Sequence, residues 1–274
     1  MIGAPRRSGY AGTVALQDWL DALDDRNRDN VARTASYLEL YAWTRAHGPE
    51  LPWLLMAHLV SRNAGYGMCD LARQLDGPRG ADPALAEASR TLFLLLERAN
   101  WLIFHDAWHH VLHHLLGRTA ALASPRTPRF MIDAWRRYEA SPDERRLVLD
   151  LVHNEQHLIE WRAVHEPRLA AGARLIDLIE RSGRERPIHF PVADAPAITI
   201  GRFASLAHRI EAGRRIFDEV VADRGRRDAL FAWASAHPHT GSRAVYGGRD
   251  GPTLREAWPV ERVRALWDGV HAPS

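Results

Sequence analysis

The sequence predicts an all-α protein, a single domain of about nine or ten helices around a central pocket lined by polar residues. Two observations lead to this fold class. Apolar residues recur with the helical period along most of the chain, and the alternation typical of strands is nearly absent. With 274 residues, of which 46% are hydrophobic, the chain is long enough to bury a large core.

Ten segments carry the helical pattern. In chain order, we expect helices at 12–23, 27–47, 51–63, 83–117, 128–139, 142–165, 167–181, 198–223, 227–236 and 260–269. Pro52 and Pro83 suit the first turn of their helices, where a missing N–H costs nothing. Residues 141–144, Ser-Pro-Asp-Glu, form a capping-box pattern that predicts a helix start.

Three segments fall outside the helices, within one domain that spans residues 1–274. Residues 1–11 are expected to be flexible, and residues 237–253, rich in turn formers, to form a packed loop. Residues 183–197 are expected to form a long irregular connection, which is the one place where the sequence allows a short strand.

Composition excludes several classes of function. All 36 basic residues are arginines, so there is no lysine for a Schiff base or a Walker-type phosphate loop. The net charge of +2 is spread over interspersed charges of both signs, which permits nucleic-acid binding but does not require it. One cysteine, and no segment apolar enough for a signal peptide or a membrane span, predict a cytoplasmic protein without a membrane partner.

Glu97 and Glu155 are the most informative residues, because each falls in the middle of the apolar stripe of its helix. A buried carboxylate must be paired, protonated or bound to a cation, since burying it alone costs several kcal/mol or more. The sequence therefore leaves two readings open: a structural ion pair with an arginine, or a functional site in which the two carboxylates act as an acid–base pair or as metal ligands.

Helix 51–63 carries the polar residues best placed to face those carboxylates. It is apolar on every side and so predicted to be buried, yet it contains His58 and, one turn later, Arg62. Arg62 is a natural counter-charge for a buried glutamate, and His58 is either a satisfied core histidine or a ligand or general base. Four further positions flank these helix faces: Arg33, Asn63, Asn100 and Asn154.

A mixed stripe on helix 27–47, which includes Arg33, Thr34, Tyr37, Tyr41 and Thr44, fits a pocket lining and a half-wet surface equally well. The loop at 239–243, His-Thr-Gly-Ser-Arg, is either an ordinary turn or an anion-binding loop that uses Arg243.

Two histidine-rich faces suggest an alternative metal site. Asp106 and His109, and likewise Asp150 and His153, have the i, i+3 spacing of metal ligands in helical bundles. Both pairs project away from the stripes that contain Glu97 and Glu155, which favours solvated surfaces over a metal centre.

Five sequence blocks resemble the YppC-like bacterial family of unknown function. They are DRNRDNVARTASY at 25–37, AHLVSRNAGYGMCDL at 57–71, LERANWLIFHDA at 96–107, NEQHLIEWR at 154–162 and HTGSR at 239–243. The resemblance implies the family's fold and a set of recurring positions, not a reaction. Those positions fall on Arg33, His58, Arg62, Asn63, Glu97, Asn100, Asp106, Asn154, Glu155 and Arg243. The chain departs from the family at His105, His109 and His110, which counts against these histidines as a shared metal site.

These features favour an enzyme or a small-molecule-binding protein. Glu97, Glu155 and His58 are the candidate catalytic residues, and the same three would hold a divalent metal ion if one is bound. Arginines would bind a small anionic ligand, with asparagines and Asp106 orienting it. The alternatives are a non-catalytic helical interaction protein with structural ion pairs, and an arginine-rich nucleic-acid-binding protein.

Overall fold

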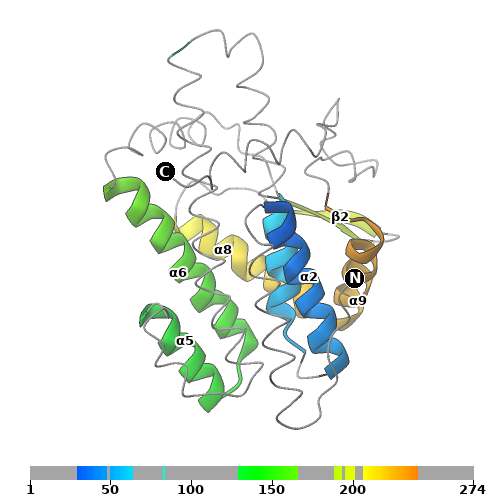
Figure 1. The fold of residues 1–274 in the computed structure, drawn as a ribbon, viewed down its shortest axis with the longest axis horizontal. Helices are drawn as coiled ribbons and strands as arrows, with labels where there is room; N and C mark the ends of the chain where they lie inside the picture. Colours follow the sequence, from blue (N-terminus) through cyan, green and yellow to red (C-terminus); the bar gives the residue numbers. More distant parts are fainter. Residues whose placement is uncertain are drawn as a thin grey trace.

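The computed structural model describes residues 30–47, 50–63, 83, 129–165, 188–192, 195–200 and 206–239. These residues form helices and one β-hairpin, arranged as a packed group in which α2, α6, α8 and α9 surround a shared core (Figure 1). The all-α prediction is confirmed in this coarse sense. The expected helices at 12–23, 167–181 and 260–269, and all but residue 83 of the one at 83–117, lie outside the described residues.

Helix α2 (Asn30–His47) and the helix at 52–63 form an antiparallel pair. Near one end, the hydroxyls of Thr34 and Ser61 lie 2.8 Å apart. At the other end, Thr44 Oγ1 accepts a hydrogen bond of 3.4 Å from the Leu51 amide. The two helices lie side by side in Figure 1, so their facing surfaces exclude water along their length.

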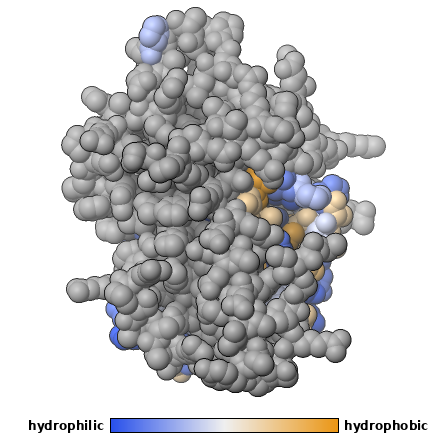
Figure 2. All heavy atoms as spheres, in the orientation of Figure 1, coloured by the Kyte–Doolittle hydropathy of each residue, from blue (hydrophilic) through white to orange (hydrophobic). Residues whose placement is uncertain are grey.

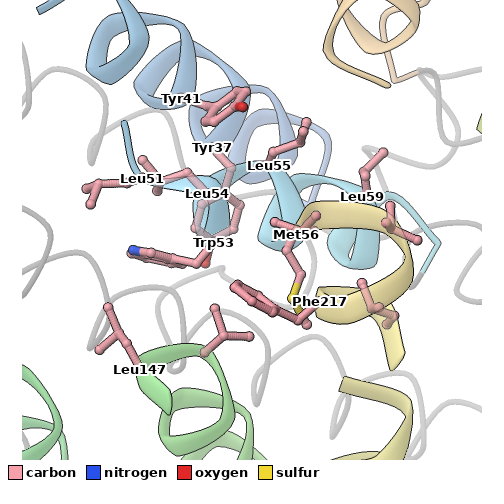
Figure 3. Packing of buried hydrophobic residues seen from close by; sticks show 14 of the residues in the cluster. Tyr37, Tyr41, Leu51, Trp53, Leu54, Leu55, Met56, Leu59, Leu147 and Phe217 are labelled. Atoms are coloured by element: carbon pink, nitrogen blue, oxygen red, sulfur yellow. The ribbon is translucent and has the colours of Figure 1, made fainter. Parts of the chain in front are cut away.

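Most of the helix at 52–63 is buried, as the sequence predicts, and Ala57, Val60 and Ser61 on one face are partly exposed. Leu54, Leu55 and Leu59 are fully buried, and Trp53 is nearly so. In Figure 3, Trp53 and Met56 of this helix point toward Leu147 of α6 and Phe217 of η4. Aromatic rings in this core pack edge to face, with centroids 6.4 Å apart for Tyr37 and Trp53. Such pairs add about 1 kcal/mol each to the free energy gained by burial.

Helices α5 (Arg129–Ala140) and α6 (Glu144–His165) follow one another and pack together. The capping residue of α6 differs from the one that the sequence predicts. Asp143, rather than Ser141, caps the helix, because its carboxylate accepts a hydrogen bond of 2.9 Å from the Arg146 amide. A carboxylate in this position satisfies a free N–H and also faces the positive end of the helix dipole.

Helix α8 (Leu206–Ile216) continues directly into a π-helical turn, η4 (Phe217–Val221). Gly213 lets α8 approach α6 closely, since a Cβ there would lie 3.1 Å from a methyl carbon of Val152. In η4 the bonding pattern widens, and the Ala222 amide donates to the Phe217 carbonyl over 2.7 Å. The wider turn keeps Phe217, Val220 and Val221 buried in the core.

Helix α9 (Arg224–Ala236) begins where η4 ends, with Asp223 as its cap. Two arginines of its first turn bind carbonyl groups at the end of η4. Arg226 donates to the Glu219 carbonyl, and Arg227 donates to those of Val221 and Ala222 over 2.8 and 3.1 Å. These bonds satisfy carbonyl oxygens that a helix end leaves without an amide partner, and they fix the corner between the two helices.

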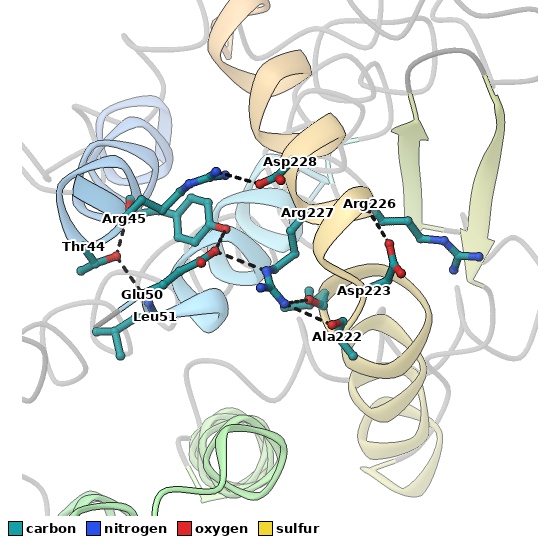
Figure 4. Close-up of polar contacts among 11 residues, drawn as sticks. Thr44, Arg45, Glu50, Leu51, Ala222, Asp223, Arg226, Arg227 and Asp228 are labelled. Atoms are coloured by element: carbon teal, nitrogen blue, oxygen red, sulfur yellow. Dashed lines mark hydrogen bonds and ion pairs between the residues drawn. The ribbon is translucent and has the colours of Figure 1, made fainter. Parts of the chain in front are cut away.

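Arg227 also connects this corner to the first helix pair (Figure 4). Its Nε donates to Glu50 over 3.3 Å, and the Tyr41 hydroxyl donates to the same carboxylate oxygen over 2.5 Å. Burial and the neighbouring Glu50 raise the pKa of Tyr41, so the phenol is the donor at every relevant pH. Nearby, Arg45 of α2 pairs with Asp228 of α9 at 2.7 Å.

Strands β1 (Ile188–Val192) and β2 (Ala195–Ile200) form an antiparallel hairpin in the segment where the sequence allows a short strand. Its register shifts between Phe190 and Val192, at Pro191, because proline has no N–H for the ladder. The predicted helix at 198–223 is therefore wrong at its start. Residues 198–200, Ile-Thr-Ile, are all β-branched, which suits a strand, and α8 begins only at Leu206.

The surface of the described part is mixed in character. In Figure 2, hydrophilic and hydrophobic residues are interspersed where the described atoms are visible. Among the described helices, none is long and apolar enough to cross a membrane.

The corner between η4 and α9 gives a stability prediction. Replacing Arg227 with Ala removes three hydrogen bonds and leaves the Glu50 carboxylate with one fewer donor, so we expect the free energy of unfolding to fall by about 2–3 kcal/mol. Arg224→Ala, at an exposed position of the same helix, is the matched control and should change it by less than about 0.5 kcal/mol. Equal effects of the two substitutions in urea denaturation would contradict this account.

Candidate functional site

The structure describes four of the predicted site residues as a buried polar group on the first helix pair. Arg33, His58 and Arg62 are at most 1% exposed, and Asn63 is 6% exposed. Asn154 of α6 is partly exposed. Glu97, Asn100, Asp106, His109 and Arg243 lie outside the described residues, as does the side chain of Glu155, so the predicted contacts with them stay predictions.

His58 is held in one orientation by a backbone carbonyl of the neighbouring helix. Its Nδ1 lies 2.7 Å from the Thr34 oxygen, and because a carbonyl can only accept, Nδ1 must carry the proton. In the neutral ring Nε2 is then an acceptor with a free lone pair. Nε2 is buried and has no hydrogen-bond partner among the described residues.

The imidazole is neutral at physiological pH. Burial, together with the charge of Arg62, lowers the pKa of His58 from 6.5 to about 4, although the bond to Thr34 acts in the opposite direction. A buried acceptor that is neutral and fixed in orientation is suited to accept a hydrogen bond or to coordinate a metal ion.

Arg62 lies one turn after His58 and connects this helix with the end of α9. Its guanidinium carbon lies 4.4 Å from the centre of the Trp233 ring, a cation–π arrangement. Its Nη2 donates a long hydrogen bond of 3.4 Å to the Pro238 carbonyl. The guanidinium therefore brings a full positive charge into a region that is closed to solvent.

Backbone carbonyls and hydroxyls orient the rest of this region. Asn63 donates from its side-chain amide to the Leu59 carbonyl over 2.8 Å. Thr34 contributes twice, through its carbonyl to His58 and through its hydroxyl to Ser61. Among the buried polar residues that the structure describes, two are arginines and none is acidic.

His239 is a residue of this region that sequence reasoning did not select. The sequence marks it only as the first residue of the loop at 239–243, yet its side chain is buried beside Arg62 and His58. Burial lowers the pKa of His239, and the nearby Arg62 and His58 lower it further, so this ring is neutral too. We name His58, Arg62, Trp233 and His239 the His58 cluster. No periodic pattern in the sequence relates His239 to Trp233 or to His58, so the sequence alone does not indicate that His239 belongs to this cluster.

The mixed stripe on α2 is buried, so its interpretation as a half-wet surface is wrong. Thr34, Tyr41 and Thr44 have no exposed area, and Tyr37 is 8% exposed. The stripe packs against the helix at 52–63, which the sequence could not place as its neighbour.

Of the alternative surface metal site, the structure describes Asp150 and His153 but not Asp106 and His109. Asp150 forms an ion pair of 2.8 Å with Arg137 of α5, and His153 is exposed. Within the part of the chain that the structure describes, no group of three or more His, Cys, Asp or Glu side chains is placed to hold a metal ion.

Comparison with known proteins identifies relatives. Residues 25–271 match the model of a family described as a protein of unknown function, DUF2515. The chain is also similar to the uncharacterized protein YppC of Bacillus subtilis (strain 168), with 30% identity over 265 residues, which cover 89% of this chain and 78% of the relative. No solved structure gives a significant match.

The lowered pKa of His58 predicts how stability depends on pH. Between pH 6.5 and pH 4 the unfolded chain binds a proton at this residue and the folded chain does not. Stability from this group is therefore complete above about pH 7 and is lost as pH falls to 4, by about 3 kcal/mol in total.

We expect His58→Gln to reduce the dependence of the unfolding free energy on pH between 7 and 4.5, as measured by urea titration, while His239 keeps its own contribution. His153→Gln replaces an exposed histidine and should keep the slope of the parent protein. A parent slope that survives in the His58 variant would show that this histidine does not carry the effect.

Proposed function

We propose that this chain, which belongs to the DUF2515 family of proteins of unknown function, is an enzyme or small-molecule-binding protein that takes a small anionic ligand at the His58 cluster. One observation carries the proposal: the Nε2 atom of His58 is buried, oriented and without a partner among the described residues, one turn from a buried arginine. Buried polar atoms of native proteins are almost always hydrogen-bonded, so such an atom calls for a ligand, a water or an ion.

Arginine is the residue best suited to bind the charged part of the ligand. A guanidinium donates in a fixed planar fork that matches carboxylate and phosphate oxygens, and its charge acts strongly where water is excluded. Arg62 lies in the cluster itself, and Arg33 is buried on the adjacent helix. Arg243 would complete the set, and Asn63, Asn100, Asn154 and Asp106 would orient the ligand.

The general base in this proposal is His58. Its neutral ring accepts at Nε2, and the bond from Nδ1 to the Thr34 carbonyl prevents the ring from rotating or exchanging tautomers. Glu97 and Glu155 would provide the second acid–base group. A buried carboxylate beside a buried arginine also balances the charge of the site, which lowers the cost of burying either.

The same two carboxylates and His58 would instead hold a divalent metal ion if the site is a metal centre. A histidine that ligates a metal commonly donates its other N–H to a carbonyl, as His58 does. The positive charge of Arg62 opposes a cation, so a metal here would need both glutamates. Elemental analysis of protein purified without a histidine tag separates the roles, because ligation requires a stoichiometric metal and acid–base chemistry requires none.

Ligand binding is tested by thermal stabilisation with small anions. A ligand that binds only the folded protein raises the free energy of unfolding by RT ln(1 + [L]/Kd), and the melting temperature rises as a result. We expect millimolar phosphate, measured at constant ionic strength, to raise the melting temperature of the parent protein by more than chloride does. Arg62→Met should abolish this shift, because it removes the charge while nearly preserving the buried volume.

Arg45→Met is the matched control, since Arg45 is a half-buried arginine that pairs with Asp228 away from His58. This variant should keep the anion-dependent shift. A shift that is the same in all three proteins would mean that anions act at another place. A parent protein that responds to no anion, and an Arg62 variant that loses several kcal/mol, would together favour the purely structural reading of the buried charges.

A further inference from the structure

His58 differs from ordinary anion-binding residues in that it has no hydrogen to offer. Its one ring proton is donated to the Thr34 carbonyl, so Nε2 presents a lone pair. An anionic oxygen placed against that lone pair would be repelled. A ligand of this site must therefore bring both negative charge and a hydrogen-bond donor of its own.

The groups around His58 reinforce this requirement. On its own helix, Arg62 faces it with a positive charge, and from the segment after α9 the neutral His239 lies beside it. From α2, the group that faces it is the Thr34 carbonyl. Within the described part of the chain, Arg62 is the charged group that acts on the pKa of His58, and Arg33 is a second buried arginine, on α2. The positive charge of Arg62 makes it costly for His58 to acquire a proton in order to become a donor.

We infer that the ligand of this site is a hydrogen phosphate group, free or esterified, whose O–H donates to His58 Nε2 while its charged oxygens accept from Arg62. The inference rests on the proposed function and names its ligand class. Carboxylates and sulfates have lost their acidic protons at neutral pH, whereas a phosphate monoester has a second pKa of about 6 and keeps a protonated fraction.

The proton is expected to stay on the ligand. With a pKa of about 4, His58 is a weaker base than the phosphate oxygen, so the bond is O–H···N rather than O⁻···H–N⁺. Binding then takes one proton from solution for each dianion that enters. Affinity should fall about tenfold for each pH unit above the second pKa of the ligand.

The test is isothermal titration calorimetry of the full-length, untagged protein with inorganic phosphate and with sulfate, at constant ionic strength and at pH values from 6 to 8. At pH 6 we expect phosphate to bind at least about tenfold more tightly than sulfate, since sulfate leaves the buried acceptor without a donor. Repeating the titration in buffers of different ionisation enthalpy should give an uptake of one proton per phosphate near pH 8.

Two further experiments follow. One compares free with esterified phosphate, and the other removes the acceptor at His58 Nε2 by substitution. Phenyl phosphate that binds more tightly than inorganic phosphate assigns the site to a phosphate ester, and the reverse order assigns it to the free ion. His58→Asn keeps an amide near the position of Nδ1 to donate to Thr34 and removes the acceptor at Nε2. We expect it to lower the preference for phosphate over sulfate toward unity, with the fold checked by circular dichroism.

Thr44→Val changes a fully buried hydroxyl at the far end of the same helix pair and should keep the full preference. Equal affinity of the parent protein for phosphate and sulfate, affinity that does not fall with pH, or tighter binding of glycolate than of phosphate would each overturn the inference. Those outcomes leave the proposed anion site intact. Absence of binding by every anion would instead remove the proposed function itself.

Discussion

The hydrogen bond from His58 Nδ1 to the Thr34 carbonyl is the interaction on which the interpretation of this molecule depends. It joins two helices that are adjacent in sequence and antiparallel in space, and it decides which nitrogen of a fully buried imidazole carries the proton. Everything that we infer about the ligand follows from the other nitrogen. If the proton lay on Nε2 instead, the site would present a donor and would accept any small anion.

In the described part of this lysine-free chain, arginines form many of the hydrogen bonds and ion pairs that connect one element with another. Arg227 contacts two carbonyls and a carboxylate, Arg45 combines an ion pair with an aromatic face, and Arg62 combines an aromatic face with a carbonyl. A guanidinium can bridge several acceptors in this way because its five N–H groups point in fixed directions. An ammonium could not replace it with the same geometry.

The surface arginines Arg137 and Arg145 form ion pairs between helices, so charge as well as packing holds those helices in position.

The sequence predicts the local features of this protein better than the distant ones. The burial of most of the helix at 52–63 is predictable because apolar residues are distributed around it, and the order of the helices follows from periodicity and caps. The hairpin at 188–200 was predicted only as a place for a strand. Residues 198–200 of its second strand fit the start of a helix equally well, because apolar runs this short suit either structure. The cap of α6 was misplaced by two residues for a similar reason, since Ser141 and Asp143 both suit the role.

In the candidate site too, the sequence predicts local features but not contacts between distant segments. The burial of His58, Arg62 and Asn63 follows from the predicted burial of their helix and is confirmed, whereas the sequence leaves the burial of Arg33 open. His239 was missed because 181 positions separate it from His58 and no local pattern relates them. Likewise, nothing in residues 52–63 reveals that the Thr34 carbonyl orients the imidazole, because that contact depends on how two helices pack. The sequence identifies which groups are costly to bury, and only the fold shows which groups compensate for that cost.

Nitrogen-15 NMR of the His58 ring tests the central claim most directly. In protein labelled at histidine, we predict that from pH 5 to pH 8 the Nδ1 resonance of His58 is that of a protonated nitrogen and its Nε2 resonance that of an unprotonated one. Neither should titrate near 6.5, the ordinary value for histidine. A ring that carries its proton on Nε2, or that titrates near 6.5, would contradict the account.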